Sequence, residues 1–121
     1  MKTRLIVFLF VCCFTSLSRL HAQEGVNKDN RFETVSIKTS AVCGDCKARL
    51  EKNLAFEKGV SKVSLDDETK IITIEYRKGR NSKESLKKAI TKIGYDADEM
   101  PADQKAHDRL PACCQKGNEP H

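Results

Sequence analysis

The chain has 121 residues, with 22 basic and 17 acidic side chains and a net charge of +5. A chain of this length folds around one small hydrophobic core, which excludes a second sizeable domain. No basic stripe interleaved with aromatic residues accompanies the positive charge, so the composition gives no indication of nucleic-acid binding.

The first 22 residues are predicted to be a signal peptide. Lys2 and Arg4 precede an apolar run over residues 5–14, and the small residue Ala22 closes a more polar stretch. This layout is typical of a leader cleaved on export, here after Ala22, and predicts a periplasmic or secreted protein. An uncleaved membrane anchor is the alternative, although the run is shorter than the ~20 residues of a spanning helix. Loss of the leader lowers the net charge to +2 and the number of cysteines from six to four.

Periodicity predicts a strand followed by a helix. Alternation over residues 32–39 indicates a strand whose buried pair is Val35 and Ile37. Apolar residues then recur every four positions from Cys46, which predicts a helix of about ten residues. We expect this helix to end near Gly59.

The next part of the chain predicts a hairpin, a second helix and a short strand. Strands are predicted over residues 60–65 and 70–76 and would pair as a hairpin. Ser82 is the expected N-cap of the second helix, which ends at Gly94. A short fourth strand is expected over residues 95–99.

Residues 31–100 therefore predict an α+β, ferredoxin-like βαββαβ domain, with a four-stranded antiparallel sheet and both helices on one face. Phe56 and Tyr76 are expected in the core or at its edge. Four lysines are expected on the solvated face of the second helix: Lys83, Lys87, Lys88 and Lys92. Residues 101–121 are predicted to be a flexible tail that contains cysteine and histidine, with one or two helical turns over residues 102–110.

The stretch Cys43-Gly44-Asp45-Cys46 carries the clearest chemical signal. It stands at the start of the first helix, where unpaired amides and a partial positive charge stabilise thiolates, the form of cysteine that binds metal. Gly44 lets the backbone bend toward an ion. Two thiolates from one loop suit Cu(I) or Hg(II) better than Zn(II), which takes four ligands. A redox dithiol and a structural disulfide are the alternatives, although no aromatic residue precedes the motif.

The motif belongs to a longer pattern, which consists of Thr39-Ser40-Ala41-Val42-Cys43-Gly44-Asp45-Cys46, Leu50, Leu54, Gly59-Val60, Val63, Ile72, Ile74, Leu86, Ala89-Ile90 and Gly94-Tyr95. This pattern resembles the heavy-metal-associated domain family. The resemblance covers residues 32–100. With a leader attached, the chain is similar in style to periplasmic mercuric-ion-binding proteins and copper chaperones.

The resemblance implies that Cys43 and Cys46 are the metal ligands and that metal moves by exchange between donor and acceptor thiolates. It implies a metal-transporting membrane ATPase or another metal-binding domain as partner, and no small-molecule substrate. It also places Tyr95 beside the metal loop, where the ring shields the site. Ala41 stands where the family has a methionine beneath the loop, which predicts looser packing there. We expect a monomer, with a metal-bridged dimer as the alternative.

Cys113 and Cys114, with His107 ahead of them, form a second candidate metal site. This pair could bind its own soft ion, complete a site with Cys43 and Cys46, or form a vicinal disulfide. A passive scavenger that uses all four cysteines is therefore the alternative to a carrier that passes metal on. The sequence contains no identifiable nucleophile and base, phosphate loop or paired carboxylates, so it does not indicate an enzyme.

Overall fold

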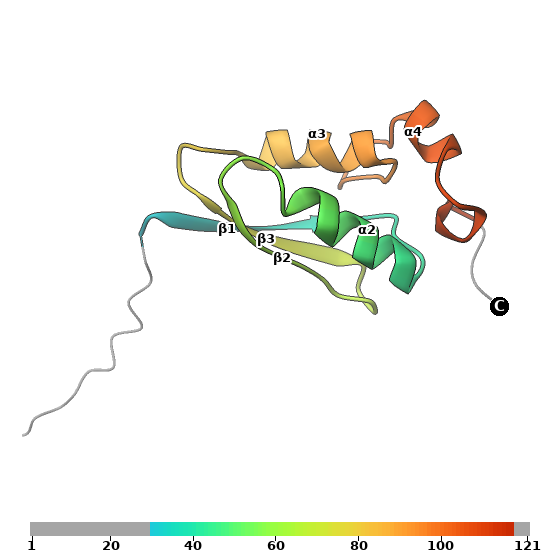
Figure 1. The fold of residues 1–121 in the computed structure, drawn as a ribbon, viewed down its shortest axis with the longest axis horizontal. Helices are drawn as coiled ribbons and strands as arrows, with labels where there is room; N and C mark the ends of the chain where they lie inside the picture. The colour runs from blue at the N-terminus through green and yellow to red at the C-terminus, as the bar shows by residue number, and fades with distance from the viewer. Residues whose placement is uncertain (1–29, 118–121) are drawn as a thin grey trace, which may run out of the picture.

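The computed structural model describes residues 30–117; the predicted signal peptide lies outside this range. In chain order the elements are β1 (Phe32–Lys38), α2 (Gly44–Leu54), β2 (Val60–Leu65), β3 (Ile71–Arg77), α3 (Lys83–Ile93), α4 (Gln104–Asp108) and the 3₁₀ turn η1 (Ala112–Cys114). The described strands form one antiparallel sheet in the order β1-β3-β2. Helices α2 and α3 cover one face of it, and α4 and η1 lie at the end of this layer where α2 begins (Figure 1). No helix within residues 30–117 is long and apolar enough to cross a membrane.

The hydrophobic core lies between the sheet and the two long helices. Val35 of β1 stands opposite Ile74 of β3, and Ile37 stands opposite Ile72. Leu65 of β2 pairs with Ile72 from the other side. Because side chains on a strand alternate between faces, these residues share the face that the helices cover, and all of them are buried. The three strands predicted from alternation are confirmed.

Helices α2 and α3 are held mainly by the apolar side chains they bury. These are Cys46, Leu50 and Leu54 on α2 and Leu86, Ala89 and Ile90 on α3. Full burial of one leucine or isoleucine is worth about 1.5–3 kcal/mol, so packing against the sheet stabilises helices too short to persist alone. The predicted caps of α3 are also present: the Ser82 side chain accepts a hydrogen bond from the Ser85 amide, and Gly94 ends the helix with a left-handed backbone.

The fourth strand predicted over residues 95–99 does not form in the described sheet. Ala97 makes isolated bridges, one of them to Thr39 beyond the end of β1. The Lys38 amide, which would donate to a fourth strand, donates instead to the Asp98 carboxylate at 2.8 Å. Asp98 also has a left-handed backbone (φ +51°), so the chain turns away from the sheet. A side chain and a tight turn close this edge, and the prediction of four strands was wrong.

The connection between α2 and β2 differs from the prediction in two respects. Helix α2 ends at Leu54, before the expected Gly59, and the Glu57 amide closes a turn onto the Leu54 carbonyl at 3.0 Å. Gly59, with φ +77°, leads into β2 rather than ending the helix. This turn directs Phe56 outward, where it is 84% exposed, so its predicted place at the core was wrong. Tyr76 is buried, as predicted.

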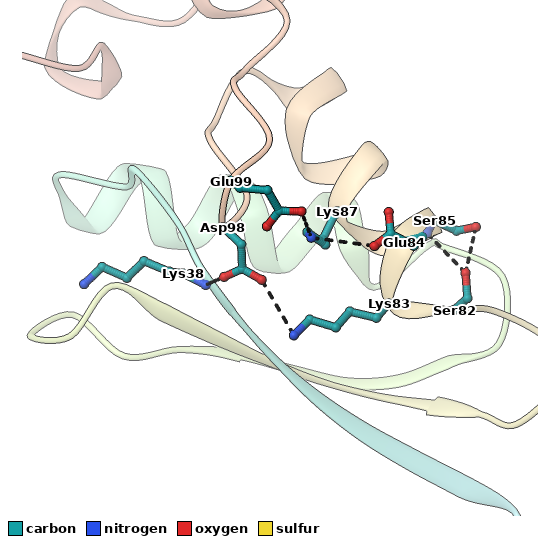
Figure 2. A network of polar contacts seen from close by, with 8 residues as sticks. All are labelled: Lys38, Ser82, Lys83, Glu84, Ser85, Lys87, Asp98 and Glu99. Atoms are coloured by element: carbon teal, nitrogen blue, oxygen red, sulfur yellow. Dashed lines mark hydrogen bonds and ion pairs between the residues drawn. The ribbon is translucent and has the colours of Figure 1, made fainter.

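Lys87 is buried on α3 instead of lying on a solvated face, with only 4% of the residue exposed. Its ammonium group forms ion pairs with Glu99, from the turn after α3, and with Glu84 one helical turn away. Figure 2 shows these pairs beside the Asp98 carboxylate, which also pairs with Lys83 at 3.6 Å. Burial of a lysine is tolerated when its charge is paired in this way. The network attaches the turn after α3 to that helix.

Residues 101–117, which we call the C-terminal segment, fold back onto the domain where a flexible tail was expected. Asp103 caps α4 by accepting a hydrogen bond from the Ala106 amide at 2.9 Å. Gly94 lets α4 approach α3 closely, because a Cβ atom there would lie 3.0 Å from the Ala106 carbonyl oxygen. Two side chains of the segment are buried: Leu110 and Cys114. The segment therefore carries its own helical turns and packs against the end of the domain.

Candidate metal centre

The loop between β1 and α2 leads to Cys43 and Cys46 and is anchored on both sides. The Thr39 hydroxyl donates a hydrogen bond to the Lys70 carbonyl at 2.9 Å. The Ser40 hydroxyl accepts one from the Asp96 amide, also at 2.9 Å. Ala41, which stands where the family has a methionine, is buried as part of the hydrophobic core. The loop is thus tied to the turn after β2 and to the turn after α3.

The start of α2 presents the Cys-Gly-Asp-Cys motif. Cys43 is the N-cap residue, with an extended backbone, and its side chain makes no capping hydrogen bond. Cys46 lies in the first helical turn, where backbone amides have no intrahelical partner. Nothing lies within 4 Å of the place a Cβ atom would take on Gly44, so this side of the loop is open. The helix N-terminus therefore favours negative charge on the sulfur atoms beside it.

The fold brings four sulfur atoms together, which we call the thiol cluster: Cys43, Cys46, Cys113 and Cys114. The Cys43 sulfur lies 3.2 Å from that of Cys46 and 3.7 Å from that of Cys114. The Cys114 sulfur lies 3.8 Å from that of Cys113. All four are free thiols, and the sulfur atoms of Cys43, Cys113 and Cys114 lie within 4.8 Å of one another. Cys43 is thus shared between the motif and the C-terminal segment.

The thiol cluster has a closed end and an open end. Cys46 and Cys114 are buried, Cys43 is half-buried and Cys113 is exposed. The exposed Cys113 sulfur lies 3.9 Å from a carboxylate oxygen of Asp45. An ion or an incoming thiolate would therefore reach the cluster from the side of Cys43 and Cys113.

Tyr95 lies at the buried end of the cluster. The residue is fully buried, and its hydroxyl has no hydrogen-bond partner within the described part of the chain. Burial, together with the thiols of Cys46 and Cys114, raises the pKa of Tyr95 above its usual value. Tyr95 is therefore a neutral phenol whose donor is free to stabilise a thiolate.

The thiols of the cluster differ in acidity. Burial raises the pKa of Cys46, but the nearby Tyr95 hydroxyl and the Val42 backbone outweigh it, so that the pKa of Cys46 falls below the usual value. Burial, and then interaction with Cys46, raise the pKa of Cys114 to about 12. Burial and the thiol of Cys46 likewise raise the pKa of Cys43. Cys46 is thus more acidic than Cys43 and Cys114, and a bound cation would favour the loss of protons from its ligand thiols.

His107 is not brought to the sulfur atoms of the cluster. Its Nε2 accepts a hydrogen bond from the Lys116 amide at 3.0 Å, and its Nδ1 lies 3.7 Å from the Asp108 carboxylate. The described groups within metal-binding distance of one another do not include it. The imidazole instead stabilises the fold of the C-terminal segment.

Asp96 and Lys116 hold the C-terminal segment to the domain, and the sequence analysis did not single them out. The Asp96 carboxylate accepts hydrogen bonds from the Lys116 ammonium at 2.8 Å and from the Ala102 amide at 2.9 Å. Burial opposes the charged form, but the pairing with Lys116 prevails and lowers the pKa of Asp96. No local pattern indicates this contact, because 20 residues separate the two partners.

The fold and the site together define a small α+β domain with a thiol site suited to soft metal ions. Comparison with protein families gives the same result, since the heavy-metal-associated domain matches residues 36–96, just over half of the chain. The chain belongs to this family, as the resemblance predicted. Among curated proteins, none matches the chain.

Solved structures share the fold over the same region. The N-terminal domain of a potential copper-translocating P-type ATPase from Bacillus subtilis is 28% identical, with 55% of this chain and 85% of that chain covered and a TM-score of 0.52. Oxidized MerP from Ralstonia metallidurans is 26% identical, with 55% and 94% covered and a TM-score of 0.53. A CopZ metallochaperone, 24% identical with 54% and 98% covered and a TM-score of 0.51, shows the fold alone. The ferredoxin-like arrangement is thus confirmed, although the described sheet has three strands.

Proposed function

We propose that the protein is an exported carrier of soft metal that binds one Cu(I) or Hg(II) ion through Cys43 and Cys46. The observation that carries this function is the pair of free thiols, 3.2 Å apart at the N-terminus of α2, in a chain of the heavy-metal-associated family. Soft, polarisable ions prefer thiolate ligands, and the helix terminus lowers the cost of forming them. Zn(II) is disfavoured as cargo of this pair alone, because it takes four ligands.

Transfer would proceed by exchange of thiolates around the ion. On binding, each ligand thiol loses its proton to solvent and donates an electron pair to the metal. Cys43 is half-buried and stands at the open end of the cluster, whereas Cys46 is buried beneath it. A thiolate of the acceptor would therefore replace Cys43 first, while Cys46 still holds the ion, and Cys43 would take up a proton on release. Tyr95 shields the ion from water at the closed end.

A metal-transporting membrane ATPase or another metal-binding domain is the proposed partner. The ATPase domain from Bacillus subtilis described above is a structure in the Cu(I)-loaded state. It supports a soft-metal ion as cargo of this chain. The signal peptide predicted over residues 1–22 supports a periplasmic or secreted location. A carrier of this kind binds its cargo and does not transform it, so we propose no enzymatic activity.

A scavenger that retains metal without a specific partner is the second candidate. The thiol cluster favours it, because Cys43 lies near Cys46 and also within 4.8 Å of Cys113 and Cys114, which is more sulfur than a two-coordinate carrier needs. Transfer of the bound ion to a separate metal-binding domain would support the carrier. Retention of the ion against that domain would support the scavenger.

Competition titration of the reduced chain of residues 23–121 tests the proposal. Cu(I), Hg(II) and Zn(II) are each added against a chromophoric chelator, and we expect one Cu(I) or Hg(II) per chain to be bound far more tightly than Zn(II). The double variant Cys43→Ser, Cys46→Ser should lose this binding with an unchanged circular dichroism spectrum. Stoichiometric uptake by the folded double variant would refute the assignment of the ligands.

A further inference from the structure

We infer that Cys113 and Cys114 complete the metal site, so that three or four thiolates hold a bound ion. Some of these thiolates come from the start of α2 and the others from the C-terminal segment. This inference rests on the proposed function and adds to it the number of thiolates that surround the bound ion. The family match ends at residue 96, so the added ligands come from a part of the chain outside it. The C-terminal segment then acts as a strap across the metal loop.

The sulfur separations favour this ligand number over a linear pair. With metal–sulfur bonds of ~2.3 Å, two sulfur atoms lie roughly 3.8 Å apart in a tetrahedral site, 4.0 Å in a trigonal site and 4.6 Å in a linear one. The distances from Cys114 to Cys43 and to Cys113 are 3.7 and 3.8 Å. Both match the tetrahedral and trigonal values. Cys43 also lies 3.2 Å from Cys46, which is shorter than all three values, so these two sulfur atoms would move apart around an ion that Cys43 shares with Cys114.

The position of the strap is built into the fold. Leu110 is buried ahead of the two cysteines, and Lys116 pairs with Asp96 behind them at 2.8 Å. Gly94 permits the close approach of α4 that sets the direction of the segment. Cys114 itself is only 1% exposed. A thiol that is anchored before and after in this way is positioned without a metal, which lowers the entropy cost of binding one.

The surroundings of the cluster are suited to several thiolates around one cation. The buried Tyr95 hydroxyl lacks a partner in the described structure and adjoins the thiols of Cys46 and Cys114. It can donate to whichever sulfur becomes negative when an ion binds. Three thiolates suit Cu(I) or Hg(II), and four also suit Zn(II) or Cd(II), so the strap widens the range of soft cations. It also makes transfer depend on release of the C-terminal segment.

X-ray absorption spectroscopy of the reduced chain of residues 23–121, loaded separately with Cu(I) and Hg(II), tests this inference by counting sulfur neighbours. We expect three or four in the wild type and two in Cys113→Ser, Cys114→Ser, with the affinity of that variant lowered roughly 100-fold through loss of tethered ligands. Lys105→Ala is the matched control, because it alters an exposed side chain of the same segment and removes no sulfur, and it should keep the wild-type number. Two sulfur neighbours in the wild type would overturn the inference while leaving the proposed function in place. No uptake by the wild type would overturn both.

A variant that keeps all four cysteines distinguishes the effect of releasing the C-terminal segment from the effect of removing its thiols. Leu110→Asp places a charge where a leucine is buried, so the C-terminal segment should leave the domain. We expect its sulfur number to fall to two, and amide hydrogen exchange over residues 104–117 to accelerate relative to the metal-loaded wild type. If exchange there accelerates but the sulfur number stays at three or more, the docked strap does not supply the ligands.

Discussion

The sulfur atoms of Cys43 and Cys114 lie 3.7 Å apart although 71 residues separate them in the chain. The first belongs to the N-terminus of α2, and the second ends η1 in the C-terminal segment. Their proximity joins two cysteine pairs into one cluster and makes the C-terminal segment part of the candidate metal centre.

Tyr95→Phe should separate the role of the hydroxyl from that of the ring. Because the buried hydroxyl has no described partner, its removal should leave the free energy of unfolding of the metal-free protein unchanged or raise it by about 1 kcal/mol. The affinity of the variant for Cu(I) should instead fall, because the hydroxyl group that donates a hydrogen bond to a thiolate is gone. Urea unfolding with and without Cu(I) measures both effects. A metal-free loss of several kcal/mol would show that the hydroxyl has a structural partner.

Gly94→Ala should destabilise the docking of α4. The residue has φ +117°, and a Cβ atom would lie 3.0–3.1 Å from the backbone of Ala106 and His107. Gly79→Ala is the matched control, because Gly79 also has a positive φ but no atom within 4 Å of its added Cβ. Both variants should lose about 1 kcal/mol from backbone strain, and Gly94→Ala should lose more. Hydrogen exchange over residues 104–108 should accelerate only in Gly94→Ala; equal behaviour would show that α4 accommodates the methyl group.

Leu50→Ala should lower the free energy of unfolding by about 2–5 kcal/mol, because Leu50 is fully buried between α2 and the sheet. Phe56→Ala, by contrast, removes a larger side chain that is 84% exposed and should change stability by less than ~0.5 kcal/mol. Thermal and urea unfolding of both variants measure the difference. A large loss for Phe56→Ala would indicate that the ring packs against a surface in solution.

Glu99→Gln should weaken the acid dependence of stability. The hydrogen bond from Lys87 lowers the pKa of Glu99 in the folded protein. A lowered pKa in the folded state stabilises the protein above the unfolded value of ~4.3, and this contribution is lost as the pH falls through the folded value. The decline in unfolding midpoint between pH 7 and pH 3 should therefore be shallower in Glu99→Gln. Equal slopes for Glu99→Gln and the wild type would contradict the assignment.

The spacing of apolar residues along the chain predicted those strands and helices in which buried residues recur at one regular interval. Alternation over β1 identified Val35 and Ile37 as buried, and four-residue spacing identified Leu50 and Leu54. The cap at Ser82 and the stop at Gly94 were predicted for the same reason, because each is set by residues within one helical turn. Cys43 and Cys46 are three residues apart, so a helix that begins between them is enough to bring their sulfur atoms together.

Lys87 and the missing fourth strand show where local pattern failed. The charge of Lys87 indicated a solvated face, but partners from the following turn made burial tolerable (Figure 2). A strand over residues 95–99 would have completed the expected βαββαβ order, yet the Asp98 carboxylate takes the hydrogen bond of the sheet edge. In both cases the outcome depends on a side chain whose partner lies on another element.

The sequence by itself therefore determined the two long helices, the three strands and the dithiol motif, because these depend on spacing within a few residues. Only the tertiary structure decided that Cys113 and Cys114 meet Cys43, and that His107 does not join them. That outcome depends on Gly94 admitting α4, on burial of Leu110 and on the pair of Asp96 and Lys116. Such contacts reach across the folded surface, and no periodicity along the chain records them.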